Sequence, residues 1–106
     1  MYKLVTRFIL VVIFGLCNAA NDFIKAAAFV RGSKPVRMSN STKLKVYALF
    51  KQATVGDCPS SGSGVSDPYR RATMNAWYDV RGMKREDAET EYVKMIDQLS
   101  PGWRNL

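Results

Sequence analysis

Apolar residues recur at the spacing of an α-helix in four segments beyond residue 20, and this pattern predicts four helices. The first is expected to begin at Asn21 or Asp22, whose side chains suit an N-cap. It is expected to end near Arg31, because Gly32 and Pro35 follow. Its apolar positions are Phe23, Ile24, Ala27, Ala28 and Val30.

The second helix is expected to begin beside Ser39, Asn40 and Ser41, which are three candidate N-caps. It ends near Val55, because Gly56 readily adopts the left-handed backbone that terminates a helix. Its end therefore falls just before a stretch that has no helical period.

That stretch, residues 57–68, is a connection rich in serine, glycine and proline. Connections between antiparallel helix neighbours are usually shorter. A connection of this length allows the second and third helices to run parallel, as overhand connections do in some bundles. Asp67 and Pro68 suit the N-cap and the first turn of the third helix, which Gly82 ends.

The fourth helix is expected from Arg85 to Leu99, because Pro101 and Gly102 follow and acidic residues in its first turn suit the helix dipole. The expected apolar stripes are Ala72, Ala76, Trp77 and Val80 in the third helix and Ala88, Tyr92, Ile96 and Leu99 in the fourth. Four helices in a chain of this length predict an all-α fold, a small four-helix bundle.

The first twenty residues have a different composition. A short basic start is followed by the apolar residues 8–16 and by the small residues 18–20, which is the layout of a secretory signal peptide. The apolar stretch is shorter than the roughly 20 residues of a membrane span. We therefore expect a signal peptide or short membrane anchor at 1–20 and one domain at 21–106; a misjudged gene start is the alternative. A signal peptide would send the protein to the secretory pathway or endoplasmic reticulum, and otherwise it would be cytoplasmic.

The formal net charge of the 106 residues is +7, and it is unevenly distributed. Residues 31–51 contain six basic residues and no acid, whereas 86–97 contain five acids. The basic region suits an anionic partner, although a solvated charged surface would have the same composition. The chain has no histidine, which excludes Ser-His-Asp and Cys-His catalysis, and its two cysteines have no metal-binding spacing. We therefore expect no catalytic residues, no metal and no cofactor.

Residues 44–57 read Leu-Lys-Val-Tyr-Ala-Leu-Phe-Lys-Gln-Ala-Thr-Val-Gly-Asp. In a helix, Tyr47, Phe50 and Lys51 lie at spacings of three and four and share one face. Two aromatic rings beside an ammonium group can bind a ligand that combines a flat ring or an apolar part with a phosphate. From spacing alone, a core aromatic residue and a surface lysine are equally open interpretations.

This run closely resembles the second helix of acyl-CoA-binding proteins, usually written Y-A-L-(F/Y)-K-Q-A-T-V-G-D. Trp77, Asp87-Ala88 and Tyr92 match the same family at compatible distances, so that the resemblance covers almost all of 21–104. It implies a four-helix up-down-down-up bundle that binds long-chain fatty acyl-CoA esters without catalysis and serves their intracellular transport and buffering. It also implies a monomer without a nucleic-acid partner, in transient contact with membranes or with enzymes that use acyl-CoA.

The resemblance also implies roles for individual residues. Lys51 would contact the nucleotide phosphate, Tyr47 would serve the nucleotide end, and Tyr92 would lie against adenine. Phe50 stands where the family has tyrosine or phenylalanine, so the hydroxyl contact of the tyrosine form is absent here. Trp77 is assigned to the core, and Trp103 is expected to pack on the bundle.

The chain departs from the family at Thr73, where a second phosphate-binding lysine is common, and at Met74, where an aromatic residue is typical. Threonine can donate a hydrogen bond but carries no charge. Arg70 and Arg71, one turn or less away, are candidates to reach the phosphates instead. Arg31 is a further candidate, because some family members have a basic residue there.

Two other classes of function fit parts of the sequence. A basic helical module that binds an anionic membrane surface or nucleic acid would show a steep salt dependence and no preference for acyl length. A carrier would show affinity that rises with acyl length. An isomerase or other acyl-CoA enzyme can carry such a domain as an appendage, but 106 residues leave no room for its catalytic domain.

Overall fold

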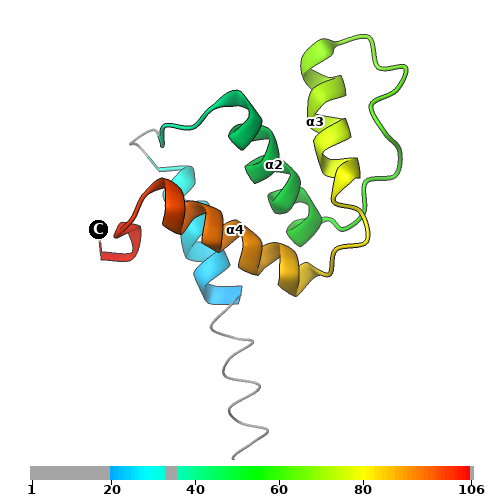
Figure 1. The fold of residues 1–106 in the computed structure, drawn as a ribbon. Coiled ribbons are helices and arrows are strands. Elements are labelled where there is room, and N and C mark those ends of the chain that lie inside the picture. The colour runs from blue at the N-terminus through cyan, green and yellow to red at the C-terminus, as the bar shows by residue number, and fades with distance from the viewer. Residues whose placement is uncertain (1–19, 33–35, 106) are drawn as a thin grey trace, which may run out of the picture.

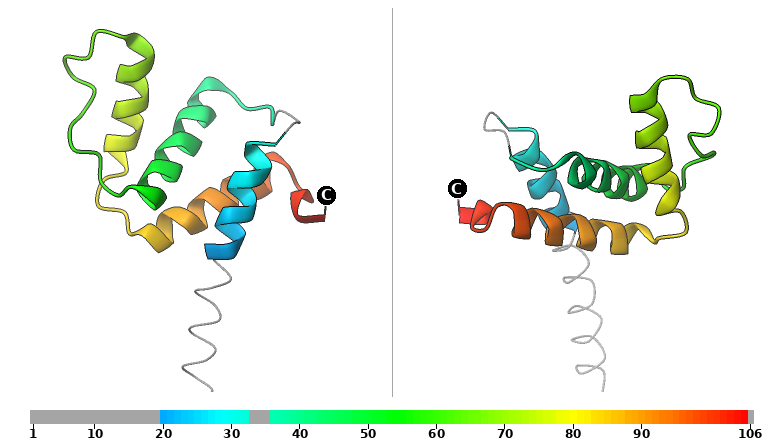
Figure 2. Two further views of the ribbon diagram at one scale, coloured as in Figure 1. Left: turned by 180° about the vertical axis from the view of Figure 1, so that it is seen from behind. Right: turned by 45° about the horizontal axis from the view of Figure 1, so that its top comes forward.

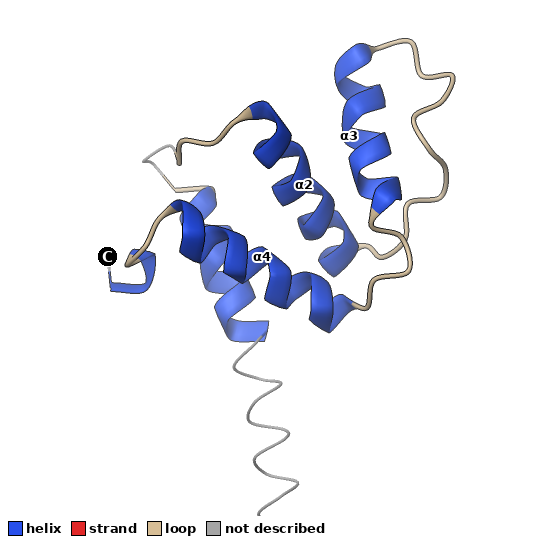
Figure 3. Cartoon of the chain, viewed as in Figure 1, coloured by secondary structure: helices blue, strands red, loops and turns tan. Residues whose placement is uncertain are grey.

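The computed structural model describes residues 20–32 and 36–105, and this part of the chain is helical without strands (Figure 3). The first helix covers residues 20–30. It is followed by α2 (Asn40–Thr54), α3 (Pro68–Asp79), α4 (Arg85–Leu99) and a short 3₁₀ turn at Trp103–Asn105. The all-α, four-helix fold predicted from the sequence is therefore confirmed.

The helices α2 and α3 lie side by side and run in the same direction, and the long loop between them returns along the outside of α3 (Figure 1). The first helix and α4 cross each other beneath α2 (Figure 2). The long connection thus has the consequence predicted for it, because a short loop would have forced α3 to run antiparallel to α2.

Side chains define the starts of α2 and α3. Ser39 is the N-cap of α2, and its Oγ accepts a hydrogen bond from the Thr42 backbone N–H at 3.2 Å. Asp67 caps α3 by accepting from the Tyr69 backbone N–H at 3.1 Å, and Pro68 follows as the first helical residue. At the other end of α2, Gly56 has a φ of 105°, which a residue with a side chain rarely adopts.

The predicted start of the first helix is wrong. Residues 20–22 are already helical, so neither Asn21 nor Asp22 is an N-cap. Asp22 instead accepts a hydrogen bond from Arg104 Nη1 at 3.0 Å, which joins the first helix to the C-terminal turn. The same turn is anchored by Trp103, whose Nε1 donates to Asp97 Oδ1 at 2.7 Å and whose ring lies 5.8 Å from that of Phe29. Trp103 therefore packs on the bundle, as expected.

The core lies where the first helix, α2 and α4 meet. Leu49 of α2 and Ile96 of α4 are its largest fully buried side chains. Phe23 of the first helix contacts Tyr92 of α4 edge to face, with ring centroids 5.1 Å apart. The buried residues of this cluster are Phe23, Ala26, Ala27, Val46, Leu49, Ala53, Ala88, Tyr92, Val93, Ile96 and Trp103.

Two of the predicted apolar stripes need correction. On the first helix, Ile24 is 63% exposed and Ala28 is also exposed, while Ala26 is buried instead. The expected stripe of α3 is only half-buried. The one buried residue of α3 is Thr73, which lies outside that stripe. The reason is that α3 packs beside α2 and contributes no residue to the core cluster, so Trp77 is not a core residue.

A polar junction ties the end of α2 to the turn between α3 and α4. The Gly82 backbone N–H and Gln52 Nε2 both donate to Asp57 Oδ1, at 2.8 Å and 2.7 Å. Gln52 Nε2 also donates to the Met83 carbonyl at 2.9 Å. The hydrogen bond from Gly82, followed by that from Gln52, lowers the pKa of Asp57 below its ordinary value, because both stabilise the ionised carboxylate.

The predicted signal peptide or anchor falls almost entirely outside the described residues, and the division of the chain at residue 20 stays a prediction. Among the helices of the described part, none has the length and apolar character needed to cross a membrane.

Candidate functional site

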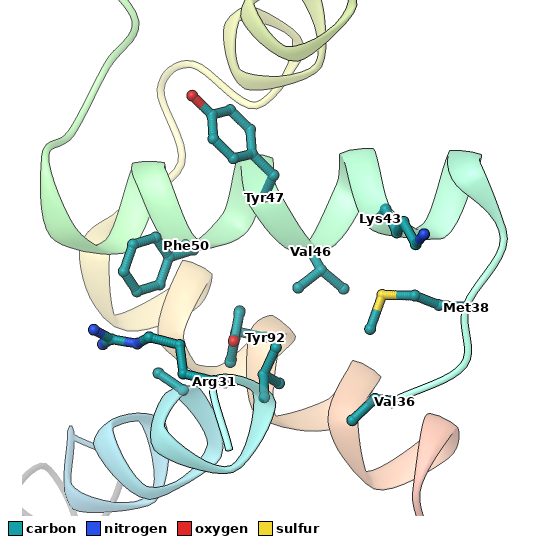
Figure 4. A pocket seen from close by; sticks show the side chains of 10 residues that line it. Arg31, Val36, Met38, Lys43, Val46, Tyr47, Phe50 and Tyr92 are labelled. Atoms are coloured by element: carbon teal, nitrogen blue, oxygen red, sulfur yellow. The ribbon is translucent and has the colours of Figure 1, made fainter. Parts of the chain in front are cut away.

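A pocket of about 360 Å³ opens between the first helix, α2 and α4 (Figure 4). Of its described lining residues, two are basic and none is acidic, so its field favours an anionic ligand. The lining residues are Ala27, Val30, Arg31, Val36, Met38, Lys43, Val46, Tyr47, Phe50 and Tyr92.

One wall of this pocket is aromatic. The rings of Phe50 and Tyr92 lie 6.3 Å apart, and Phe23 packs behind both of them. The guanidinium carbon of Arg31 lies 5.8 Å from the centre of the Phe50 ring, within the range of a cation–π interaction. This wall offers a flat apolar surface with a positive charge at its edge.

Tyr92 is a neutral phenol in this pocket. Its side chain is buried, and burial raises the pKa of the hydroxyl above its ordinary value, although the positive charge of Arg31 acts in the opposite direction. A neutral phenol can both donate and accept a hydrogen bond. Tyr92 therefore adds a polar group to a wall that is otherwise apolar.

A second, smaller pocket of about 300 Å³ lies between α2 and α3. Its lining residues are Asn40, Lys43, Leu44, Tyr47, Tyr69, Ala72 and Thr73. Tyr47 lines both pockets, so they meet at this side chain. In Figure 4 its hydroxyl points away from Arg31, which directly follows the first helix. A ligand that fills both pockets must pass over Tyr47.

Lys51 lies beside this junction and lines neither pocket. Its Nζ is 5.9 Å from the centre of the Tyr47 ring and 5.6 Å from that of Trp77. The Trp77 indole is itself fixed, because Nε1 donates to the Gly56 carbonyl at 2.8 Å. Trp77 thus holds an ammonium group beside Tyr47, which is a different role from the core position expected from its spacing.

The structure brings most of the predicted site residues together. Arg31, Tyr47, Phe50 and Tyr92 line the first pocket, and Thr73 lines the second. The Thr73 hydroxyl donates to the Arg70 carbonyl within its own helix at 3.0 Å.

Arg70 and Arg71 line neither pocket, and both are exposed. Arg71 Nη1 donates to the carbonyl of Val65 in the long loop, at 3.3 Å. Of the two arginines suggested as substitutes for the missing lysine, Arg71 is therefore directed to the loop.

Several lining residues were not predicted as site residues. Lys43 precedes Tyr47 by four residues, so helical spacing contained the signal for it. Leu44 and Tyr69 could be found only once α3 was known to lie against α2. Val36 and Met38 lie in the loop before α2, where no periodicity marks them.

These features define a small helical bundle with two adjoining pockets, lined by aromatic, apolar and basic side chains. The chain belongs to the acyl-CoA-binding protein family: residues 20–96 match the family model described as acyl CoA binding protein. The acyl-CoA-binding protein of Saccharomyces cerevisiae is 42% identical over 65 residues, which are 61% of this chain and 75% of that protein. The solution structure of acyl CoA binding protein from Babesia bovis is similar with a TM-score of 0.69 and 40% identity, covering 82% of this chain and 99% of that one.

The family domain also occurs within a larger enzyme. Human enoyl-CoA delta isomerase 2 is 42% identical over 62 residues, which are 58% of this chain but only 16% of the human protein. The similarity therefore covers a small part of that enzyme.

Proposed function

We propose that this protein binds long-chain fatty acyl-CoA esters reversibly, without catalysis, and buffers and transports them. The observation that carries the proposal is the meeting of two pockets at Tyr47: the first has the aromatic wall of Phe50 and Tyr92 with Arg31 at its edge, and the second includes Leu44 and Ala72 among its lining residues. An acyl-CoA has the same division into an aromatic, anionic nucleotide and an apolar chain. The family membership supports the same conclusion.

In this proposal the adenine lies against Phe50 and Tyr92, and Arg31 and Lys51 face the phosphates. Charged hydrogen bonds of this kind typically contribute about 1.5–3 kcal/mol each. Tyr47 lies under the link between the nucleotide and the chain.

The acyl chain would occupy the pocket between α2 and α3. Leu44, Tyr69 and Ala72 line it, and Tyr69 is 74% exposed in the free protein. Removing apolar chain from water contributes about 0.8 kcal/mol for each buried CH₂ group. Affinity should therefore rise with acyl length until the chain extends beyond the pocket.

The alternative of a basic module for an anionic membrane surface or nucleic acid rests on the basic residues of 31–51 and on Tyr47 and Phe50 interleaved with them. It gives no reason for a cation to lie over Phe50 or for the aromatic wall behind it. We therefore favour the carrier, in which charge and aromatic surface act together on one ligand.

Calorimetric titration of the 106-residue chain with acyl-CoA esters of increasing length tests the proposal. We expect saturable binding of one ligand per chain, with affinity rising from octanoyl-CoA to palmitoyl-CoA and with palmitate far weaker than palmitoyl-CoA. Anionic phospholipid vesicles and a duplex DNA serve as controls for charge alone. Equal affinity for all chain lengths, together with tight salt-dependent binding to the vesicles or the DNA, would contradict the carrier.

A further inference from the structure

Lys43 lies where the two pockets meet. Of the residues that line the described pockets, only Lys43 and Tyr47 belong to both the pocket beneath α2 and the one between α2 and α3. Figure 4 shows Lys43 on the same stretch of α2 as Tyr47, while Arg31 lies at the other end of the first pocket, below Phe50. The two basic residues therefore enter the site from opposite ends.

The surroundings of Lys43 leave its charge uncompensated. The described lining of the two pockets contains no acidic residue, and the first turn of α2 contains none. None of the salt bridges in the described part of the chain involves Lys43. Lys43 is exposed, and it lines two pockets whose other described lining residues are mostly apolar or aromatic.

The facing side of the same pocket lacks a cation. Thr73 of α3 lines the pocket across from α2, carries no charge, and donates its hydroxyl to Arg70 O. Arg71 is directed to the loop at Val65. Among the described residues, Lys43 is thus the one basic residue that lines the pocket between α2 and α3.

We infer that Lys43 is a phosphate-binding residue of this protein and supplies from α2 the positive charge that α3 does not provide. The inference rests on the proposed function, because the phosphate belongs to the bound acyl-CoA. A ligand that passes from the first pocket over Tyr47 into the second comes within reach of the Lys43 ammonium group. Because the 3′-phosphate and the pyrophosphate of acyl-CoA carry more negative charge than the single carboxylate of a free fatty acid, Lys43 would favour acyl-CoA over a free fatty acid.

The test compares Lys43→Met with Lys45→Met in the 106-residue chain. Methionine keeps a flexible apolar stem and removes the charge, and Lys45 is exposed on the same helix but lines neither pocket. Lys43→Arg keeps the charge. We expect Lys43→Met to bind palmitoyl-CoA about tenfold more weakly, which corresponds to about 1.4 kcal/mol, while Lys45→Met and Lys43→Arg stay within about threefold of the parent. Binding of palmitate should not change.

A second ligand identifies the phosphate. Dephospho-palmitoyl-CoA lacks the 3′-phosphate. If Lys43→Met weakens the binding of this ligand as much as that of palmitoyl-CoA, Lys43 contacts the pyrophosphate. If Lys43→Met weakens it much less, Lys43 contacts the 3′-phosphate. Circular dichroism checks that each variant is folded, with Lys43→Gln as a second neutral variant. If Lys43→Met and Lys45→Met have equal affinities while the parent binds palmitoyl-CoA, this inference is wrong. If the parent does not bind palmitoyl-CoA, the proposed function itself fails.

Discussion

Replacing Lys51 by methionine should separate the binding role of this side chain from its role in the free protein. In the free protein the Lys51 ammonium group lies near two rings, those of Tyr47 and Trp77. A cation–π interaction at an exposed site contributes about 0.5–1 kcal/mol. Methionine keeps a long stem and a similar helix propensity, so the free energy of unfolding should fall by about 1 kcal/mol or less.

The effect on binding should be larger. If Lys51 donates a charged hydrogen bond to a phosphate, its removal costs about 1.5–3 kcal/mol and weakens palmitoyl-CoA binding by roughly ten- to 150-fold. A loss of stability near 1 kcal/mol would lower the melting temperature by about 4–8 °C in a domain of this size. The two effects are therefore distinguishable in the same preparation.

Calorimetric titration measures the affinity and differential scanning calorimetry measures the stability. Lys51→Arg should retain most of the affinity, and Lys45→Met controls for the loss of one positive charge from α2. An unchanged affinity in Lys51→Met, with a lowered melting temperature, would refute the phosphate contact and leave Lys51 as a packing residue for Tyr47 and Trp77.

Three further predictions concern other parts of the chain. Tyr92→Ala should destabilise the free protein by about 3–5 kcal/mol, measured by urea unfolding, because it empties a buried site. Tyr92→Phe should keep the stability and weaken palmitoyl-CoA binding by at most about tenfold. The pKa of Asp57 is lowered in the folded protein. The ionised Asp57 side chain should therefore contribute fully to stability above the ordinary carboxyl pKa of about 4, and this contribution should be lost as the pH falls through the lowered pKa of the folded protein. Urea unfolding of Asp57→Asn at a series of acidic pH values should show a weaker pH dependence than the parent, and an identical dependence would contradict the assignment. A reporter fused to residues 1–20 should enter the secretory pathway in a eukaryotic cell, and a cytosolic reporter that retains Met1 would count against a signal peptide.

The sequence was sufficient to predict most of the helix boundaries, because local chemistry determines them. Ser39, Asp67 and Gly56 act through their own side chains or backbone on the adjacent turn. The starting point of the first helix was not predictable in this way, because Ala20 is already helical and no cap is needed at Asn21.

Which face of a helix is buried depended on packing between helices. On the first helix Ile24 and Ala26 are both apolar and both fit a helical stripe, but only Ala26 faces the bundle. Trp77 was assigned to the core because it lies in a helical stripe with alanines. Its actual position follows from the packing of α3 beside Lys51. The spacing of residues within α3 does not predict that packing.

The candidate site was predictable where one helix carries it. Spacing within α2 placed Tyr47, Phe50 and Lys51 on one face, and the match to the family indicated a ligand-binding role for them and for Tyr92. The pocket between α2 and α3 could not be predicted, because Leu44 and Tyr69 come together only in the folded chain.

The central claim is that one acyl-CoA molecule occupies both pockets, with its nucleotide beneath α2 and its chain between α2 and α3. Intermolecular nuclear Overhauser effects in the isotope-labelled protein with unlabelled palmitoyl-CoA test it most directly. The account predicts contacts from the adenine protons to Phe50 and Tyr92, and from the acyl methylene protons to Leu44 and Ala72. Adenine contacts that lie elsewhere, or methylene protons that contact no residue of the second pocket in a saturated complex, would contradict it.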